Sequence, residues 1–71
     1  MGRRLYLKVG DLVMHSEHRG WGRGEVVEEK HSALEGGFCM VRILFDDGKE
    51  RSFINDLDHQ QCCYYFGLKL V

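Results

Sequence analysis

Residues 38–53 read FCMVRILF-DDG-KERSF and predict a β-hairpin. Two extended runs flank a turn, and Gly48 suits the left-handed position that closes such a turn because it has no Cβ. The two-residue period of a strand puts four apolar residues on one face: Cys39, Val41, Ile43 and Phe45. Arg42 marks the opposite face, shared with Met40 and Leu44, as the wetter side. An isolated hairpin is marginally stable in water, so this one requires neighbouring strands.

The rest of the chain supplies those neighbours. Alternating apolar and polar residues predict three more strands, at about 11–15, 25–31 and 68–71. His15 falls on the inward face of the first strand with Val13, which favours a hydrogen-bonded structural histidine. Residues 32–37 are predicted to form a connecting loop, and residues 54–57 one tight helical turn. No longer segment has a convincing helical period.

These elements predict an all-β fold in a single domain. A chain of 71 residues is long enough for one small core. A short, strongly bent sheet must close on itself to bury one face, so we expect a small SH3-like (Tudor-like) five-stranded antiparallel barrel with one short helical turn. Residues 1–7 are an N-terminal arm, with Tyr6 packed on the barrel. Residues 8–71 are the barrel domain, and 58–71 are its C-terminal extension.

Composition and charge narrow the function classes. The net charge of −1 excludes a general grip on polyanions, since non-specific DNA-binding proteins usually carry a strong positive excess. No apolar run approaches the ~20 residues that span a bilayer, and no signal peptide is recognisable, so we expect a cytoplasmic protein with no membrane partner. Three cysteines, two of them adjacent, do not make a disulfide framework, and reduced thiols fit a cytosol.

The loop at 16–24 contains the single tryptophan of the chain, set among glycines in Gly20-Trp21-Gly22-Arg23-Gly24. The loop lacks the Gly-Lys-Ser/Thr of a phosphate-binding loop and the context of a dinucleotide fingerprint, so we expect no nucleotide there. Trp21 is either an interface anchor, flanked by Arg19 and Arg23, or a plug that folds back onto one end of the barrel. The sequence leaves both interpretations open.

Three motifs together resemble a known family: Val9-Gly10-Asp11-x-Val13-x-His15, Gly20-x-Gly22-x-Gly24-x-Val26 and Val41-x-Ile43-x-Phe45-Asp46-x-Gly48, with Leu57 after one turn. Their order resembles bacterial Tudor-like modules with the SH3 fold. These include the C-terminal Tudor-like domain of UvrD/PcrA helicases and the RNA-polymerase-interacting domain of CarD-type and Mfd-type proteins. The resemblance covers about residues 8–57. The chain departs from the family in longer loops at 16–24 and 32–37, in residues 58–71, and in carrying no helicase motor.

The resemblance also implies a function. In those relatives the module is a docking domain, which implies a non-catalytic protein-interaction module in a bacterial cytoplasm. The implied partner is RNA polymerase or another protein of transcription and DNA repair. We expect the contact to use Arg19, Trp21 and Arg23, aided by an exposed edge strand that pairs with the partner's backbone.

Two alternatives differ in what the barrel contacts. A nucleic-acid-binding barrel would use a local basic and aromatic patch, and Arg3, Arg4 and Lys8 are the candidate residues for it. A homo-oligomer would exchange residues 58–71 between chains to cover apolar surface. The sequence does not fix the oligomeric state.

No catalytic residue, metal site or cofactor is predicted. His15-x-x-His18 lacks the Cys-x-x-Cys pair that would complete a zinc site, and cysteines in apolar surroundings usually act as small core residues. Tyr64-Tyr65-Phe66 would suit a methyl-lysine cage or base stacking, but a small barrel needs such rings in its core. The Cys62-Cys63 pair with His59 lacks the geometry of a nucleophile and base, so we expect no enzyme.

Overall fold

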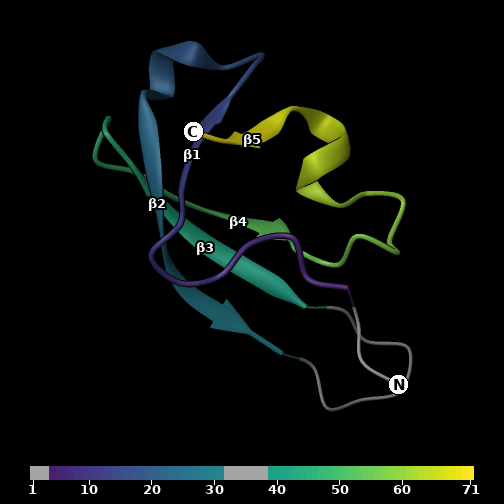
Figure 1. Cartoon of the computed structure of the whole chain (residues 1–71). Helices are drawn as coiled ribbons and strands as arrows, with labels where there is room; N and C mark the ends of the chain where they lie inside the picture. The colour runs from purple at the N-terminus through teal and green to yellow at the C-terminus, as the bar shows by residue number, and fades with distance from the viewer. Residues whose placement is uncertain (1–3, 32–38) are drawn as a thin grey trace.

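The computed structural model describes residues 4–31 and 39–71 of the chain. In this part of the chain, one antiparallel sheet has the strand order β4-β3-β2-β1-β5. Its strands are β1 (Leu12–His15), β2 (Arg23–Lys30), β3 (Met40–Phe45), β4 (Glu50–Ile54) and β5 (Leu68–Leu70). The sheet curls into a half-barrel, and the segment before β1 passes over it (Figure 1). The predicted fold class, an all-β, five-stranded antiparallel barrel, is confirmed.

The long strand β2 belongs to both halves of the curled sheet. Its first residues pair with β1, and most of its length pairs with β3. The register of the second pairing shifts between Val26 and Glu28, which is a β-bulge. Because a bulge bends its strand and increases the local twist, β2 can turn the sheet around a single core.

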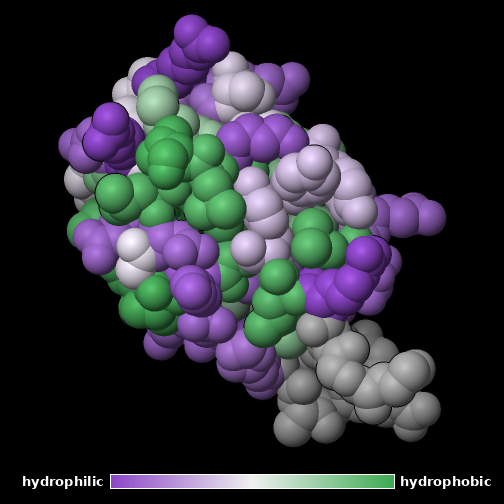
Figure 2. Space-filling model, viewed as in Figure 1, coloured by the Kyte–Doolittle hydropathy of each residue, from purple (hydrophilic) through white to green (hydrophobic). Residues whose placement is uncertain are grey.

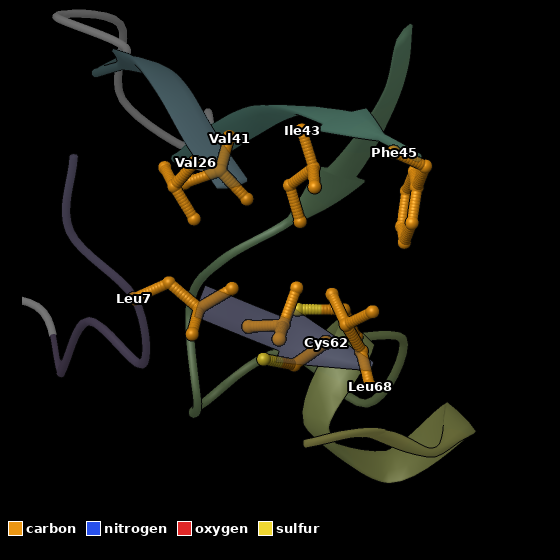
Figure 3. Close-up of a cluster of buried hydrophobic side chains, with 9 residues drawn as sticks. Leu7, Val26, Val41, Ile43, Phe45, Cys62 and Leu68 are labelled. Carbon is orange, nitrogen blue, oxygen red and sulfur yellow. The ribbon is translucent and has the colours of Figure 1, made fainter. Parts of the chain in front are cut away.

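The core lies inside this curl. Among the described residues its buried cluster consists of Leu7, Val13, Val26, Val41, Ile43, Phe45, Cys62, Cys63 and Leu68. In Figure 3, the side chains from β2 and β3 point across the interior toward Leu7, Cys62 and Leu68. The predicted alternation of the hairpin and the core role of the cysteines are therefore confirmed. Residues before β1 and after β4 are integral parts of the barrel.

The helical turn predicted at 54–57 is wrong. Ile54 ends β4, and Asp56 forms an isolated β-bridge with Leu5. The backbone stays extended because the N-terminal arm satisfies it: Leu57 N–H donates to the Arg4 carbonyl at 2.8 Å. In the described ranges the helical segments are two 3-10 turns, η1 (Arg19–Trp21) and η2 (Cys63–Phe66). Neither has the length and apolar character needed to cross a membrane. The loop predicted at 32–37 lies outside the described residues.

The turn between β3 and β4 is tied to the loop before β2. Gly48 has a φ of 83°, as the sequence predicted, and its N–H donates to the Phe45 carbonyl at 2.9 Å. Asp47 N–H donates to the Trp21 carbonyl of that loop at 3.3 Å. Asp46 bonds the first residue of β2: its N–H donates to the Arg23 carbonyl, and its Oδ2 accepts from the Arg23 N–H at 3.0 Å. Two segments far apart in the sequence therefore form one end of the barrel.

Gly24 is required by packing, which gives a test of this end of the barrel. A Cβ at residue 24 would lie 2.5 Å from Ile43 Cγ2 and 2.8 Å from Phe45 Cε1, both in the core. We expect Gly24→Ala to lower the free energy of unfolding by about 1–3 kcal/mol, as overpacking typically does. Urea denaturation followed by Trp21 fluorescence measures the change.

Gly20→Ala is the matched control. A Cβ at Gly20 meets nothing within 4 Å, so this variant should unfold at or slightly above the wild-type midpoint. Equal midpoints for the two alanine variants would show that the core tolerates a methyl group at residue 24.

Candidate functional site

Trp21 lies in a cluster of rings at one end of the barrel. The turn η1 directs its indole onto the last residue of β3, where it meets Phe45 edge-on with ring centroids 5.2 Å apart. His15 also approaches it edge-on, at 5.2 Å. His18 stacks on it at 4.2 Å, with 6° between the ring planes. The tryptophan therefore joins the loop, β1 and β3.

A cation completes this cluster. The guanidinium carbon of Arg51 lies 3.9 Å from the indole centroid. Because stacked groups approach no closer than about 3.5 Å, Arg51 and His18 cannot share one face of the indole. Arg51 also donates to both carboxylate oxygens of Asp47, at 3.2 and 2.9 Å, and this lowers the pKa of that carboxyl. Trp21 is half-buried and covered on both faces, a position that matches the plug interpretation.

His15 gives the cluster a pH dependence. Burial, and secondarily the charge of His18, lower the pKa of His15 against a smaller opposing effect of Glu17. The unfolded chain has an ordinary histidine pKa near 6.5. As the pH falls, residue 15 is therefore protonated in the unfolded state before it is protonated in the folded state. We expect stability to be fully present above about pH 6.5 and to fall as the pH drops through the lowered pKa. Each unit of difference in pKa changes the unfolding free energy by about 1.4 kcal/mol.

Urea denaturation at pH 5.5 and 7.5 measures this effect, and His15→Asn should flatten the difference between the two pH values. His18→Gln is the comparison, because it removes only the secondary cause of the lowered His15 pKa and should reduce the difference less than His15→Asn does. If His15→Asn keeps the full pH dependence, another group controls it.

The two arginines of the loop are exposed. Neither Arg19 nor Arg23 forms an ion pair with the described residues, in contrast to Arg42, which lies 3.0 Å from Glu50 and 3.4 Å from Glu28. The structure therefore separates the predicted trio. Trp21 is enclosed, whereas the charges beside it face solvent.

A row of side chains crosses the outer face of the sheet beside these arginines. Met14 pairs with Arg23 of β2 on one side and with Lys69 of β5 on the other. Residues directly opposite in antiparallel strands share a face, so the three side chains form one row. A hollow of about 340 Å³ at this place is lined by Met14, His15, Ser16, Arg19 and Lys69. Arg19 and Lys69 line this hollow, and Arg23 lies across Met14 from Lys69. These three residues are here called the basic row.

Exposed aromatic rings adjoin the basic row. Tyr65 and Phe66 of η2 are 56% and 55% exposed, and Tyr64 is 40% exposed. Lys69 connects the two groups, since its Nζ lies 3.7 Å from the Tyr64 ring centroid and donates to the Tyr64 carbonyl at 3.0 Å. A second hollow, of about 330 Å³, is lined by all three rings together with Ser16, Glu17 and Lys69. Figure 2 shows weakly polar, pale surface over η2, with a hydrophilic strip over β5 and apolar surface near the C-terminus.

Sequence reasoning did not find Lys69. The Leu68-Lys69-Leu70 pattern predicts that Lys69 faces solvent. It does not predict which strand lies beside Lys69. The three basic candidates at the N-terminus differ in what the structure describes. Arg4 pairs with Asp58 at 2.7 Å, and that hydrogen-bonded carboxylate raises the pKa of its guanidinium. Lys8 is exposed, and Arg3 lies outside the described residues.

The strand β4 has an open outer edge. Phe45 N–H donates to the Lys49 carbonyl, and Asn55 N–H donates to the Cys39 carbonyl. By the alternation of an antiparallel ladder, Arg51 and Phe53 therefore face β3, while Glu50, Ser52 and Ile54 direct their backbone groups outward. No described residue pairs with these outward groups. Glu50 and Ser52 are exposed, and Phe53 and Ile54 are half-buried beside the edge.

The thiols offer little chemistry. Cys62 and Cys63 are buried, and burial raises the pKa of Cys63 to about 12, which disfavours the thiolate. Cys39 Sγ lies 3.5 Å from His31 Nδ1, and His31 Nε2 lies 3.5 Å from Glu29. This order is that of a nucleophile, a base and a carboxylate, but Cys39 is itself buried. Within residues 4–31 and 39–71, no three His, Cys, Asp or Glu side chains gather as metal ligands.

Comparison with known proteins adds no relative. No family model, curated protein or solved structure matches this chain. Two features of the surface are open to a binding partner: the outer edge of β4 and the basic row with its aromatic neighbours.

Proposed function

We propose that this chain is a non-catalytic docking module that binds an extended segment of a protein partner along the outer edge of β4. One observation carries the proposal: the backbone groups of Glu50, Ser52 and Ile54 face outward and pair with no described residue. A row of unpaired N–H and C=O groups on an edge strand is a template for a strand from another chain. Only a polypeptide can extend such a ladder.

The side chains beside the edge indicate what the partner segment contains. Phe53 is half-buried on the inner face of β4, opposite Val41, so an apolar residue of the added strand would extend that face and cover it. Glu50 is held by Arg42 at 3.0 Å, which leaves a mixed charged surface on the outer face of this strand. We therefore propose a partner strand with alternating apolar and polar residues.

The resemblance to bacterial Tudor-like docking domains supports RNA polymerase, or another transcription or repair protein, as the partner. In this proposal the enclosed Trp21 acts indirectly. Its contact with Arg51, which lies 3.9 Å away, positions the first half of β4. Residues that hold the edge strand in place serve docking without touching the partner.

A proline at residue 52 tests this edge selectively. The Ser52 N–H faces outward, so Ser52→Pro removes a donor from the open edge while leaving the pairing with β3 intact. Binding to purified core RNA polymerase, measured by biolayer interferometry after nuclease treatment, should fall more than tenfold. Ser52→Ala keeps the N–H and should bind like the wild type.

Two results would contradict the proposal. If Ser52→Pro has the wild-type circular dichroism spectrum and affinity, the partner does not use β4. If the wild-type protein does not bind the polymerase, the named partner is wrong. Glu50→Pro is a second variant for the case in which Ser52→Pro does not fold. It also removes an outward N–H, at the first residue of the strand, where proline is well tolerated, and it should weaken binding as well.

A further inference from the structure

We propose that the basic row and the exposed rings of η2 form a binding site for single-stranded nucleic acid. This site lies at the β5 side of the sheet, whereas β4 is the opposite edge in pairing order. It is therefore independent of the docking proposed for β4, and one molecule can use both. It also replaces the N-terminal basic residues as the candidate contact with nucleic acid.

The cations of this site are free to meet phosphates. Arg19 and Arg23 form no ion pair with described residues, and Lys69 contacts only the ring and carbonyl of Tyr64 among them. The other described arginines are compensated: Arg4 pairs with Asp58, Arg42 with Glu28 and Glu50, and Arg51 with Asp47. A chain of net charge −1 thus keeps three cations without an ion pair to a described residue at this surface, beside the carboxylates of Glu17 and Asp46. Phosphates bound there would release counterions.

The rings of η2 suit bases better than they suit an acidic peptide. Tyr65 donates its hydroxyl to the Leu57 carbonyl at 2.8 Å and meets Tyr64 edge-on at 5.4 Å, so its ring is held in place while more than half exposed. Phe66 carries no polar group on its ring, and the flat face of a stacked base would cover this exposed ring. Bases stack on such fixed rings in any sequence, which is how single-strand-binding grooves work.

The two hollows give the strand a continuous path. Ser16 and Lys69 line both of them, so the hollow beside Arg19 runs into the hollow lined by the rings. The backbone phosphates would meet Arg19 and Lys69 in these hollows and Arg23 beyond Met14, with bases on Tyr65 and Phe66. Glu17 lines the aromatic hollow, which places a carboxylate beside the bases, where it can accept from their amino groups. A duplex hides its base faces and cannot use the rings.

Fluorescence anisotropy with a labelled, unpaired oligonucleotide of about ten adenines and cytosines tests the site on the full chain. Three phosphate contacts at about 0.7 per contact give a slope of log affinity against log salt near −2. A duplex of the same length should bind more weakly. Phe66→Ala should weaken single-strand binding by roughly tenfold, the size typical of losing one stacked base.

Matched variants separate this site from other charges. Lys69→Gln should weaken binding and reduce the salt slope by about 0.7, whereas Lys8→Gln, an exposed lysine outside the site, should change neither. Tyr65→Phe keeps the ring but loses the hydroxyl that holds it, so it should bind more weakly than the wild type and more tightly than Tyr65→Ala. Ser52→Pro should also bind the oligonucleotide normally, which distinguishes failure of this site from failure of the β4 edge.

The outcomes are decisive in either direction. Loss of affinity in Phe66→Ala and Lys69→Gln, with unchanged thermal midpoints and normal binding by Lys8→Gln, supports the site. Absence of binding at low salt overturns it. Equal losses in Lys8→Gln and Lys69→Gln, or displacement of the oligonucleotide by polyglutamate at equal charge, would show a surface that responds to charge alone. Full binding by Phe66→Ala would exclude base stacking on η2.

Discussion

Replacing Asn55 with leucine is expected to lower the free energy of unfolding by about 3 kcal/mol, one of the largest effects in this chain. Asn55 is only 1% exposed, and its side-chain amide bonds both backbone groups of Leu7, as a neighbouring strand would. Its Oδ1 accepts from the Leu7 N–H at 2.7 Å, and its Nδ2 donates to the Leu7 carbonyl at 2.8 Å. Leucine would leave two buried backbone groups without partners, at about 1–3 kcal/mol each.

This loss is a large fraction of the stability of a domain of this size, which is about 4–11 kcal/mol. We expect the thermal midpoint, followed by circular dichroism, to fall by about 12–24 °C. Hydrogen exchange adds a local readout, since the Leu7 amide should lose its protection. Gln61→Leu, which removes an exposed amide, should stay within about 0.5 kcal/mol of the wild type. Similar midpoints for both variants would mean that Asn55 does not hold the arm.

The Asn55 contact illustrates a limit of sequence reasoning. The hairpin at 38–53 was predictable because its signals are local: alternation, a turn and a glycine at the left-handed position. The partner of Asn55 is 48 residues away, and a short polar residue before Asp56 is typical of a turn. The arm supplies hydrogen bonds that a helical turn would otherwise make internally. The wrong prediction at 54–57 therefore comes from a tertiary contact with no local signal.

The candidate surfaces were predictable to different degrees. The exposure of Arg19 and Arg23 follows from a charged, glycine-rich loop. The placement of Lys69 beside Met14 depends on β1 pairing with β5, which a sequence alone does not specify. The enclosure of Trp21 depends on Arg51 and Phe45, which come from two other strands. Sequence patterns fix which residues alternate, while the pairing of distant strands decides which of them meet.

Trp21→Ala is expected to lower the free energy of unfolding by about 2–3 kcal/mol. The side chain contacts Phe45, His15, His18 and Arg51, and it closes one end of the core. Full burial of tryptophan would make the loss about 3–5 kcal/mol, and Trp21 is half-buried. Thermal denaturation followed by circular dichroism measures the effect, because the variant lacks the single tryptophan of the chain.

The same variant separates the two interpretations of Trp21. An interface anchor would leave the midpoint unchanged and abolish docking, whereas a plug lowers the midpoint and weakens docking only through the position of β4. Phe66→Ala is the matched control, since it removes an aromatic ring that is 55% exposed and carries no hydrogen bond, and it should cost little stability. A Trp21→Ala protein that melts like the wild type but no longer binds its partner would establish the anchor. We expect instead a lowered thermal midpoint with weakened but detectable binding, because both faces of the indole are already occupied by His18 and Arg51.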